Sequence, residues 1–316
     1  MEKNAKIYVA GHSGMLGKAI VRMLRERGHD NLLLRTSAEL DLRRQSDVEA
    51  FFERERPQYV ILAAARVGGI WANMNNPAPF FYDNMMIQLN VVHAACTFGT
   101  KRLLFVSSSC SYPRMCPQPM KEEAILTGPP EPTNEYYAIA KISGMKMIEA
   151  YHRQHGVQFF SVIFPNLFGP GDNFDPRESH VIAALIRRFH EAAAGTLAEV
   201  EIWGTGLARR EFLYVDDAAD ACLFFIDRLS GGEAVNAGAG MDISIGELAR
   251  LIGKISGYGG RLVFDPTKPD GMPQKLLDVT AMQKLGWAPR VSLDEGLRRT
   301  CEWYAQSTAG PRGKKA

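Results

Sequence analysis

The chain has 316 residues, of which 46% are hydrophobic and 23% charged, and its formal net charge at pH 7 is +2. A chain of this length forms one large domain or two modest ones. The composition is that of an ordinary globular protein, and the small net charge argues against a surface dedicated to nucleic acid or membrane. We therefore expect no nucleic-acid partner and no membrane partner.

The five cysteines are scattered and form no CxxC pair, a pattern that fits a reducing compartment and gives no support to a metal site. No signal-peptide pattern is visible, and no apolar stretch approaches the ~18 residues that a membrane span needs. We expect a cytoplasmic protein without bound metal. Residues 310–316 are basic and lack large apolar side chains, so we expect this tail to be disordered.

The first half of the chain alternates short apolar runs with longer amphipathic ones. Alternation of this kind predicts βαβ units and a doubly wound parallel sheet, which is an α/β fold. Strands are expected at residues 7–10, 32–34, 59–62, 103–106 and 159–164, and helices at residues 15–27, 47–55, 80–96 and 135–152.

After Asn166 the rhythm changes, and Pro and Gly cluster before a long helix expected at residues 180–194. Short strands at residues 201–203 and 211–215 precede a helix that begins at Asp216. We expect a second, smaller α/β domain. The division places residues 1–165 with 212–237 in the first domain, and residues 166–211 with 238–316 in the second.

The two helices at residues 80–98 and 135–152 are apolar on more than one face, although covering one face of a sheet needs a single apolar stripe. The surplus suggests a helix–helix contact in a homodimer, and burial within the monomer is the open alternative. The surplus residues are Met85, Met86, Ile87, Ile142, Met145, Met147 and Ile148.

A glycine-rich segment, GHSGMLG at residues 11–17, lies between the first expected strand and the first expected helix. Glycine permits a tight turn and a close approach of the backbone to a diphosphate. The helix N-terminus adds amide donors and a favourable dipole. The segment predicts a Rossmann-type dinucleotide site, and a purely structural glycine turn is the weaker interpretation.

The second expected strand leads into Arg35, Thr36 and Ser37. NAD-binding proteins usually place Asp or Glu about 20 residues after the glycine motif, where the acid binds the ribose 2′-hydroxyl. Arginine with two hydroxyl neighbours suits a 2′-phosphate better, so this segment favours NADP. The alternative is that Arg35 stands in a short turn and points to solvent.

Tyr137 and Lys141 are four residues apart and share one face of an expected helix. A neighbouring ammonium lowers the pKa of a phenol from about 10, which suits Tyr137 to proton transfer at neutral pH. The spacing alone is weak, because such pairs are common on solvated helices. A serine cluster at residues 107–111 follows a strand. There, Ser108 could donate a hydrogen bond to the substrate carbonyl on which Tyr137 would act.

With these elements in order, the chain resembles the extended short-chain dehydrogenase/reductase superfamily and, within it, the GDP-L-fucose synthase family. Members of that family epimerise C3 and C5 of GDP-4-keto-6-deoxy-D-mannose and reduce its C4 ketone. The resemblance covers the chain up to about Tyr304. Its motifs are AAARVGGI at 63–70, SSCSYP at 108–113, EPTNEYYAIAK at 131–141, NLFGP at 166–170, DN at 172–173, SHV at 179–181, REF at 210–212, VDD at 215–217 and PDG at 269–271.

The resemblance implies a role for each member of the site. The reductase triad would be Ser108, Tyr137 and Lys141, and the epimerisation acid/base pair would be Cys110 and His180. The GDP-sugar would meet Arg188, Trp203, Arg210 and Asp270. NADP, with NADPH as reductant, would meet Gly11, Ser13, Gly14, Met15, Leu16, Gly17, Arg35, Ser37, Ala63, Ala64, Ser107, Tyr137, Lys141, Pro165, Asn166, Leu167 and His180.

This assignment makes chemical sense for Cys110 and His180. The C3 and C5 protons flank a ketone, and inversion needs a base on one face of the ring and an acid on the other. An extended backbone would place Cys110 on the same side as Ser108, and a modest fall of the thiol pKa from about 8.5 would make it a usable base. Outside the resemblance, a lone Cys or His is more often inert.

Two departures from the family pattern leave details open. Ser13 and Ser37 stand where some relatives carry arginine, which leaves the strictness of NADPH preference open. Gln274 stands where a basic residue is common beside the substrate, which leaves the sugar open. Among the arginine pairs, Arg187 and Arg209 are the less expected ligands, since adjacent residues on a helix face about 100° apart.

Three other functions compete with this one. The first is the same chemistry on another GDP-4-keto sugar, such as a deoxyheptose or a 3,6-dideoxy sugar. The second is a 4,6-dehydratase, which would carry a carboxylate where Cys110 stands. The third is a non-catalytic dinucleotide sensor, which would often lack the Tyr–Lys pair.

Overall fold

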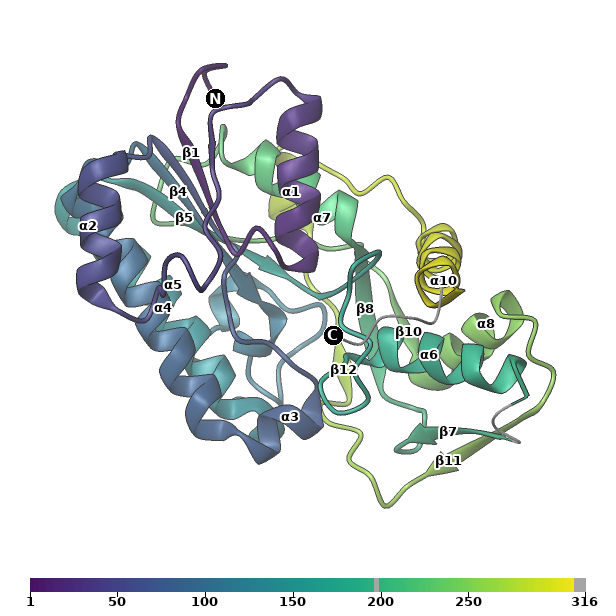
Figure 1. The fold of residues 1–316 in the computed structure, drawn as a ribbon. Helices are drawn as coiled ribbons and strands as arrows, with labels where there is room; N and C mark the ends of the chain where they lie inside the picture. Colours follow the sequence, from purple (N-terminus) through teal and green to yellow (C-terminus); the bar gives the residue numbers. More distant parts are fainter. Residues whose placement is uncertain (196–198, 310–316) are drawn as a thin grey trace.

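The computed structural model describes residues 1–195 and 199–309, and the predicted tail at 310–316 lies outside them. The large sheet has six parallel strands in the order β2-β1-β3-β4-β5-β9 (Figure 1). Its members are β1 (Ile7–Ala10), β2 (Leu32–Leu33), β3 (Tyr59–Leu62), β4 (Arg102–Ser108), β5 (Gln158–Phe164) and β9 (Ala234–Asn236).

Helices cover both faces of this sheet. Strands β1 and β3 are buried at every residue, as expected for continuous apolar runs between two helical layers. On one face pack α1 (Met15–Glu26) and α7 (Val215–Phe225). On the other face pack α2 (Gln45–Glu55), α4 (Pro77–Thr97) and α5 (Glu135–His155), of which α4 and α5 lie side by side (Figure 1).

A smaller region follows β5. Strand β8 (Arg209–Tyr214) pairs with β6 (Asn166–Phe168), β10 (Asp242–Ser244) and β12 (Gln274–Lys275), while β7 (Glu199–Trp203) pairs with β11 (Arg261–Asp265). Its helices are α6 (Val181–Ala193), α8 (Ile245–Ile255) and α10 (Leu293–Ala309), around a separate apolar core (Figure 1). Short helices complete the fold: α3 (Ile70–Asn75), α9 (Thr280–Lys284), η1 (Ser109–Ser111), η2 (Glu122–Ala124) and η3 (Pro132–Asn134).

The predicted fold class is confirmed, because a doubly wound parallel sheet is joined to a smaller α/β region. Every expected element is present; β1 and β3 have the expected bounds, and the other elements have shifted ends. Strand β4 runs on to Ser108 instead of ending at residue 106, and α5 continues to His155, where Gly156 adopts φ 67°. Strands β6, β9, β10, β11 and β12 were not predicted; all but β11, which has five residues, are three residues or shorter and give too brief a pattern.

Only some of the surplus apolar side chains on α4 and α5 are buried within the monomer. Ile142, Met145 and Ile148 are buried, whereas Met85, Met86, Ile87 and Met147 are half-buried. On the same helices Phe81, Tyr82 and Leu89 are exposed. Within residues 1–195 and 199–309, no helix has both the length and the apolarity needed to cross a bilayer.

Candidate active site

One cavity of about 1070 Å³ follows the carboxyl ends of β1, β3, β4 and β5 and continues over β8 and β12. This edge of a parallel sheet is where ligands bind in open α/β folds. The cavity is lined by all the site residues expected from the sequence: Gly11, Ser13, Gly14, Met15, Leu16, Gly17, Arg35, Ser37, Ala63, Ala64, Ser107, Ser108, Cys110, Tyr137, Lys141, Pro165, Asn166, Leu167, His180, Arg188, Trp203, Arg210 and Asp270.

The glycine turn at one end is built for close backbone approach. Gly11 has φ +86°, and a Cβ there would lie 2.6 Å from the amide nitrogen of Ala64. A Cβ on Gly17 would collide with the carbonyl of Gly11. Gly14 precedes α1 without a side-chain cap, so the first amides of the helix remain available as donors to an anion. A dinucleotide diphosphate fits this turn.

Arg35 lies beyond the glycine turn with two serines near it along the cavity wall. Its Nη1 donates to the carbonyl of Leu34 at 2.9 Å, and its Nη2 lies 3.5 Å from the Glu55 carboxylate. The side chain is one-third exposed, while Ser13 and Ser37 are both exposed. Arg35 therefore neither points freely to solvent nor makes a tight ion pair.

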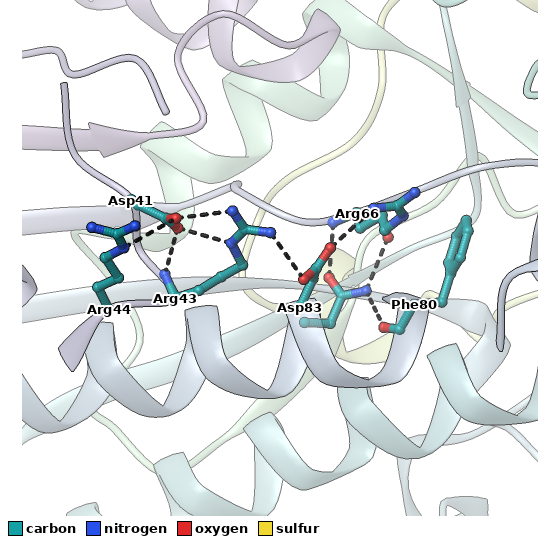
Figure 2. A network of polar contacts seen from close by, with 7 residues as sticks. Asp41, Arg43, Arg44, Arg66, Phe80 and Asp83 are labelled. Atoms are coloured by element: carbon teal, nitrogen blue, oxygen red, sulfur yellow. Dashed lines mark hydrogen bonds and ion pairs between the residues drawn. The ribbon is translucent and has the colours of Figure 1, made fainter. Parts of the chain in front are cut away.

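A polar network closes the wall next to this end of the cavity. Figure 2 shows the Arg43 guanidinium between Asp41, at 2.9 Å from Nε to Oδ1, and Asp83, at 3.3 Å from Nη1 to Oδ1. Arg66 donates to the other oxygen of Asp83 at 3.0 Å, and the Asn84 amide binds the backbone of Arg66. The network ties the loops after β2 and β3 to α4. Arg66 belongs to the AAARVGGI motif, but the motif predicted no role for this network.

Tyr137 and Lys141 occupy the first two turns of α5, and both line the cavity. The predicted lowering of the Tyr137 pKa is wrong, because burial raises it, the Cys110 thiolate raises it further, and only the Ser108 hydroxyl acts in the opposite direction. Burial also lowers the pKa of Lys141 to about 7, and its Nζ donates to the carbonyl of Val106 at 2.9 Å. Tyr137 is thus a neutral phenol, able to donate a proton.

An extended backbone was expected after Ser108, but the chain forms the short helix η1 there instead. Ser108 caps this turn, and its Oγ accepts a hydrogen bond from the Cys110 amide at 3.3 Å. The turn brings the Cys110 thiol to two donors from distant segments. Asn134 Nδ2 lies 3.0 Å from Sγ, and Lys275 Nζ lies 3.4 Å from it.

The charge on Lys275 acts on both members of the expected acid/base pair. Burial would raise the pKa of the Cys110 thiol, but the Lys275 ammonium, the Ser108 hydroxyl and Arg210 lower it below its ordinary value. Burial and the same ammonium lower the pKa of His180, so the imidazole is neutral at neutral pH. His180 precedes α6 without capping it and lines the cavity.

At the other end of the cavity, each arginine pair divides as expected. Arg187 pairs with Glu191 at 3.0 Å, whereas Arg188 lines the cavity. On β8, Arg209 pairs with Asp242 at 2.7 Å, whereas Arg210 lines the cavity and donates to the carbonyl of Asp270 at 2.9 Å. Trp203 lines the same wall, and the Asp270 carboxylate accepts two hydrogen bonds from Thr205.

Sequence reasoning missed Lys275 and Asn134. The residue expected beside the substrate was Gln274, the neighbour of Lys275. Neighbouring residues on a strand point to opposite faces, so only one of the two can face the cavity. Gln274 pairs in register with Arg209 and donates to Asp242, while Lys275 pairs in register with Arg210 and faces the cavity. Within the described residues, no group of three or more His, Cys, Asp and Glu side chains could hold a metal ion.

Comparison with known proteins identifies relatives of this chain. Residues 7–238 match the NAD dependent epimerase/dehydratase family. The chain is 56% identical to GDP-L-fucose synthase 1 of Arabidopsis thaliana over 97% of this chain and 95% of that protein. It is also similar to the structure of a GDP-6-OMe-4-keto-L-xylo-heptose reductase from C. jejuni, with a TM-score of 0.92, 36% identity and coverage of 97% and 99%.

A GDP-L-fucose synthetase from Naegleria fowleri bound to NADP aligns with a TM-score of 0.90 at 28% identity, covering 99% of this chain and 96% of that one. The matches thus extend over both regions of the fold. The chain belongs to the NAD dependent epimerase/dehydratase family and, within it, to the GDP-L-fucose synthases.

Proposed function

We propose that this protein converts GDP-4-keto-6-deoxy-D-mannose to GDP-L-fucose, by epimerisation at C3 and C5 followed by NADPH-dependent reduction of the C4 ketone. One observation carries the proposal. The activated thiol of Cys110 shares a cavity with a half-buried, neutral Tyr137, so a base for proton abstraction and an acid for ketone reduction would stand beside the same substrate.

NADP fits the cavity end formed by the glycine turn. The turn and the uncapped start of α1 would hold the diphosphate, and Arg35 with Ser13 and Ser37 would face the 2′-phosphate. When bound, NADPH supplies the hydride for C4. The related GDP-L-fucose synthetase that carries NADP supports this choice of cofactor.

Epimerisation requires proton transfer on both faces of the sugar ring. Cys110, held as thiolate by Lys275 and Asn134, takes a proton from the carbon next to the ketone. The negative charge moves to the C4 oxygen, where Tyr137 and Ser108 donate hydrogen bonds. His180 in its imidazolium form, which is the minor form at neutral pH, returns a proton from the other face and becomes neutral. The Cys110 thiol then loses its proton to solvent and His180 takes one up, which restores the pair.

Reduction of the C4 ketone follows, and the C4 oxygen takes up a proton. The raised pKa of Tyr137 keeps its proton available, and the phenol transfers that proton to the C4 oxygen as the carbon is reduced. Lys141 Nζ lies 5.9 Å from the centre of the Tyr137 ring and is held by its hydrogen bond to the Val106 carbonyl. Its pKa of about 7 allows both protonation states, which suits it to relay the replacing proton. Arg188, Arg210 and Trp203 would bind the GDP moiety.

The test is to follow NADPH oxidation with GDP-4-keto-6-deoxy-D-mannose, identify the product sugar, and run Cys110→Ser beside the wild type. We expect GDP-L-fucose from the wild type, and from the variant an uninverted reduced sugar or no inversion. An uninverted sugar from the wild type would point to a reductase alone, the activity named for the heptose relative. If the wild type oxidises neither NADPH nor NADH with this sugar, the proposed substrate is wrong.

We also propose a homodimer through α4 and α5. Phe81, Tyr82 and Leu89 are exposed on α4 and Met147 is half-buried on α5, which leaves apolar side chains at the surface of this helix pair and favours association. Light scattering after gel filtration should give twice the chain mass, and Leu89→Glu should give the monomer mass. Leu285→Glu changes an exposed leucine outside these helices and should leave the dimer intact.

The proposal also assigns a ligand to each of the two regions and a compartment to the protein. Residues 1–165 with 212–237 would bind NADP, and residues 166–211 with 238–316 would bind the GDP-sugar. All five cysteines are free, which supports a reducing compartment such as the cytoplasm.

A further inference from the structure

Glu211 is a buried carboxylate to which the proposed reaction assigns no task. It lies on β8 next to the cavity-lining Arg210, and its side chain is completely shielded from solvent. A buried carboxylate costs free energy unless hydrogen bonds compensate it. What Glu211 binds therefore indicates what this charge does.

The two oxygens of Glu211 join two distant segments. Oε1 accepts from the Gly240 amide at 2.8 Å, and Oε2 accepts from the Leu277 amide at 2.8 Å. A Cβ on Gly238 would overlap the carboxylate, so this position admits only glycine beside it. Burial raises the pKa of Glu211 to about 7, although the backbone amides of Leu277, Gly240 and Ala239 act to lower it.

The Leu277 contact leads directly to the reacting thiol. Leu277 lies two residues after Lys275, on the short segment that follows β12. Strand β12 has only two residues, and pairing with Arg209 and Arg210 is its whole ladder. Beyond that ladder, Gln118 accepts from the Leu276 amide at 2.9 Å, Met120 donates to the Leu276 carbonyl at 2.7 Å, and the Glu211 carboxylate accepts from the Leu277 amide. Glu211 is the charged member of this set of contacts, which holds the segment whose Lys275 Nζ lies 3.4 Å from Cys110 Sγ.

We propose that Glu211 is a positioning residue for epimerisation, which holds the Lys275 segment so that the ammonium stays against the Cys110 thiol. The effect on catalysis rests on the proposed function, because it requires Cys110 to be the base. The effect on the reactivity of the Cys110 thiol does not depend on the proposed function.

Asp217 offers a matched control. It is also buried, and its carboxylate accepts the amides of Arg290 at 3.1 Å and Val291 at 2.9 Å. It lies on α7, behind the large sheet, and it does not line the cavity. Asp217→Asn therefore removes a similar buried carboxylate–amide contact without touching the segment of Lys275.

The experiment compares wild type, Glu211→Gln and Asp217→Asn as full-length protein. Iodoacetamide alkylation of Cys110 is measured against pH by mass spectrometry, with Cys96 as the internal reference thiol. Hydrogen exchange at C3 and C5 is measured in deuterated buffer with the keto sugar. We expect Glu211→Gln to slow both at pH 7 by at least tenfold and to move the alkylation midpoint to higher pH, with Asp217→Asn close to wild type.

A double variant tests whether Glu211 acts through Lys275. In a Lys275→Met background, Glu211→Gln should add less than twofold to either effect, because the group that it positions is already gone. If Glu211→Gln does not fold, Glu211→Asp shortens the side chain while keeping the charge, and the same measurements apply to it.

Three results decide the matter. A wild-type alkylation profile in a folded Glu211 variant overturns the proposal. Equal slowing in Glu211→Gln and Asp217→Asn also overturns it, because the effect would then be loss of general stability. A shifted alkylation profile with unchanged C3 and C5 exchange supports the positioning role and refutes Cys110 as the base of the proposed function.

Discussion

Replacing Lys275 with methionine should separate the two half-reactions. Methionine keeps much of the length of the side chain and removes its charge. The thiol of Cys110 then loses the ammonium that lies 3.4 Å from Sγ, and burial is left to raise its pKa. His180 loses the same charge, which had disfavoured imidazolium, so its pKa rises as well.

The size of the effect follows from the distance. Two unit charges about 4 Å apart interact by about 4 kcal/mol at an effective dielectric constant of 20. Residual hydrogen bonds from Asn134 and Ser108 offset part of this loss. A third of the Coulomb energy, about 1.4 kcal/mol, already lowers the thiolate fraction tenfold. We expect C3 and C5 exchange at pH 7 to fall at least tenfold.

The pH profile provides the sharper readout. Exchange at C3 and C5 depends on a pair that carries one proton between its two pKa values, so its rate against pH is bell-shaped. Because both pKa values rise in Lys275→Met, both limbs of the bell should move to higher pH. Reaction in deuterated buffer, analysed by mass spectrometry of the sugar, measures the profile, and Lys284→Met on α9 serves as the control.

The reasoning would be refuted by one particular pattern. If exchange falls equally at every pH with both limbs in place, Lys275 only orients the substrate and does not set the charge of Cys110 and His180.

Three further predictions concern other parts of the molecule. Tyr137→Phe should lower the rate of NADPH oxidation at least 100-fold while C3 and C5 exchange, measured by deuterium incorporation, stays detectable, because Ser108 still donates to the C4 oxygen; loss of both would mean that epimerisation also requires the phenol. Arg35→Gln should raise the dissociation constant of NADPH at least fivefold and leave that of NADH within twofold in calorimetric titrations, and an equal loss for both would show that Arg35 does not bind the 2′-phosphate. Gly144→Ala should lower the free energy of unfolding in urea by about 1–3 kcal/mol, because its Cβ would lie 2.7 Å from the Phe105 ring, whereas Gly259→Ala, with no atom within 4 Å, should change it little.

The sequence was sufficient for the parts of the fold with strong local patterns. The buried strands at 7–10 and 59–62 and the glycine turn each carry their own signal, so the dinucleotide end was predictable. Strand β12, with two residues, has no period to detect, and it exists because β8 pairs with it. That is why Lys275 escaped notice although the neighbouring Gln274 did not.

Electrostatic environments were harder to predict than positions. The Tyr137–Lys141 spacing correctly placed both residues on the cavity wall, yet the direction of the tyrosine pKa was wrong. Spacing along a helix shows which groups are neighbours, but not how much water surrounds them. The bond from Lys141 to Val106, which occupies one donor of the ammonium, is likewise a tertiary contact and leaves no trace in the spacing.

The source of the charge beside Cys110 has a consequence for the newly made protein. The thiol and the ammonium are 165 positions apart in the chain. Before the C-terminal segment is made, the Cys110 thiol lacks the ammonium that lowers its pKa. The lowered pKa of this thiol therefore depends on docking of the C-terminal segment.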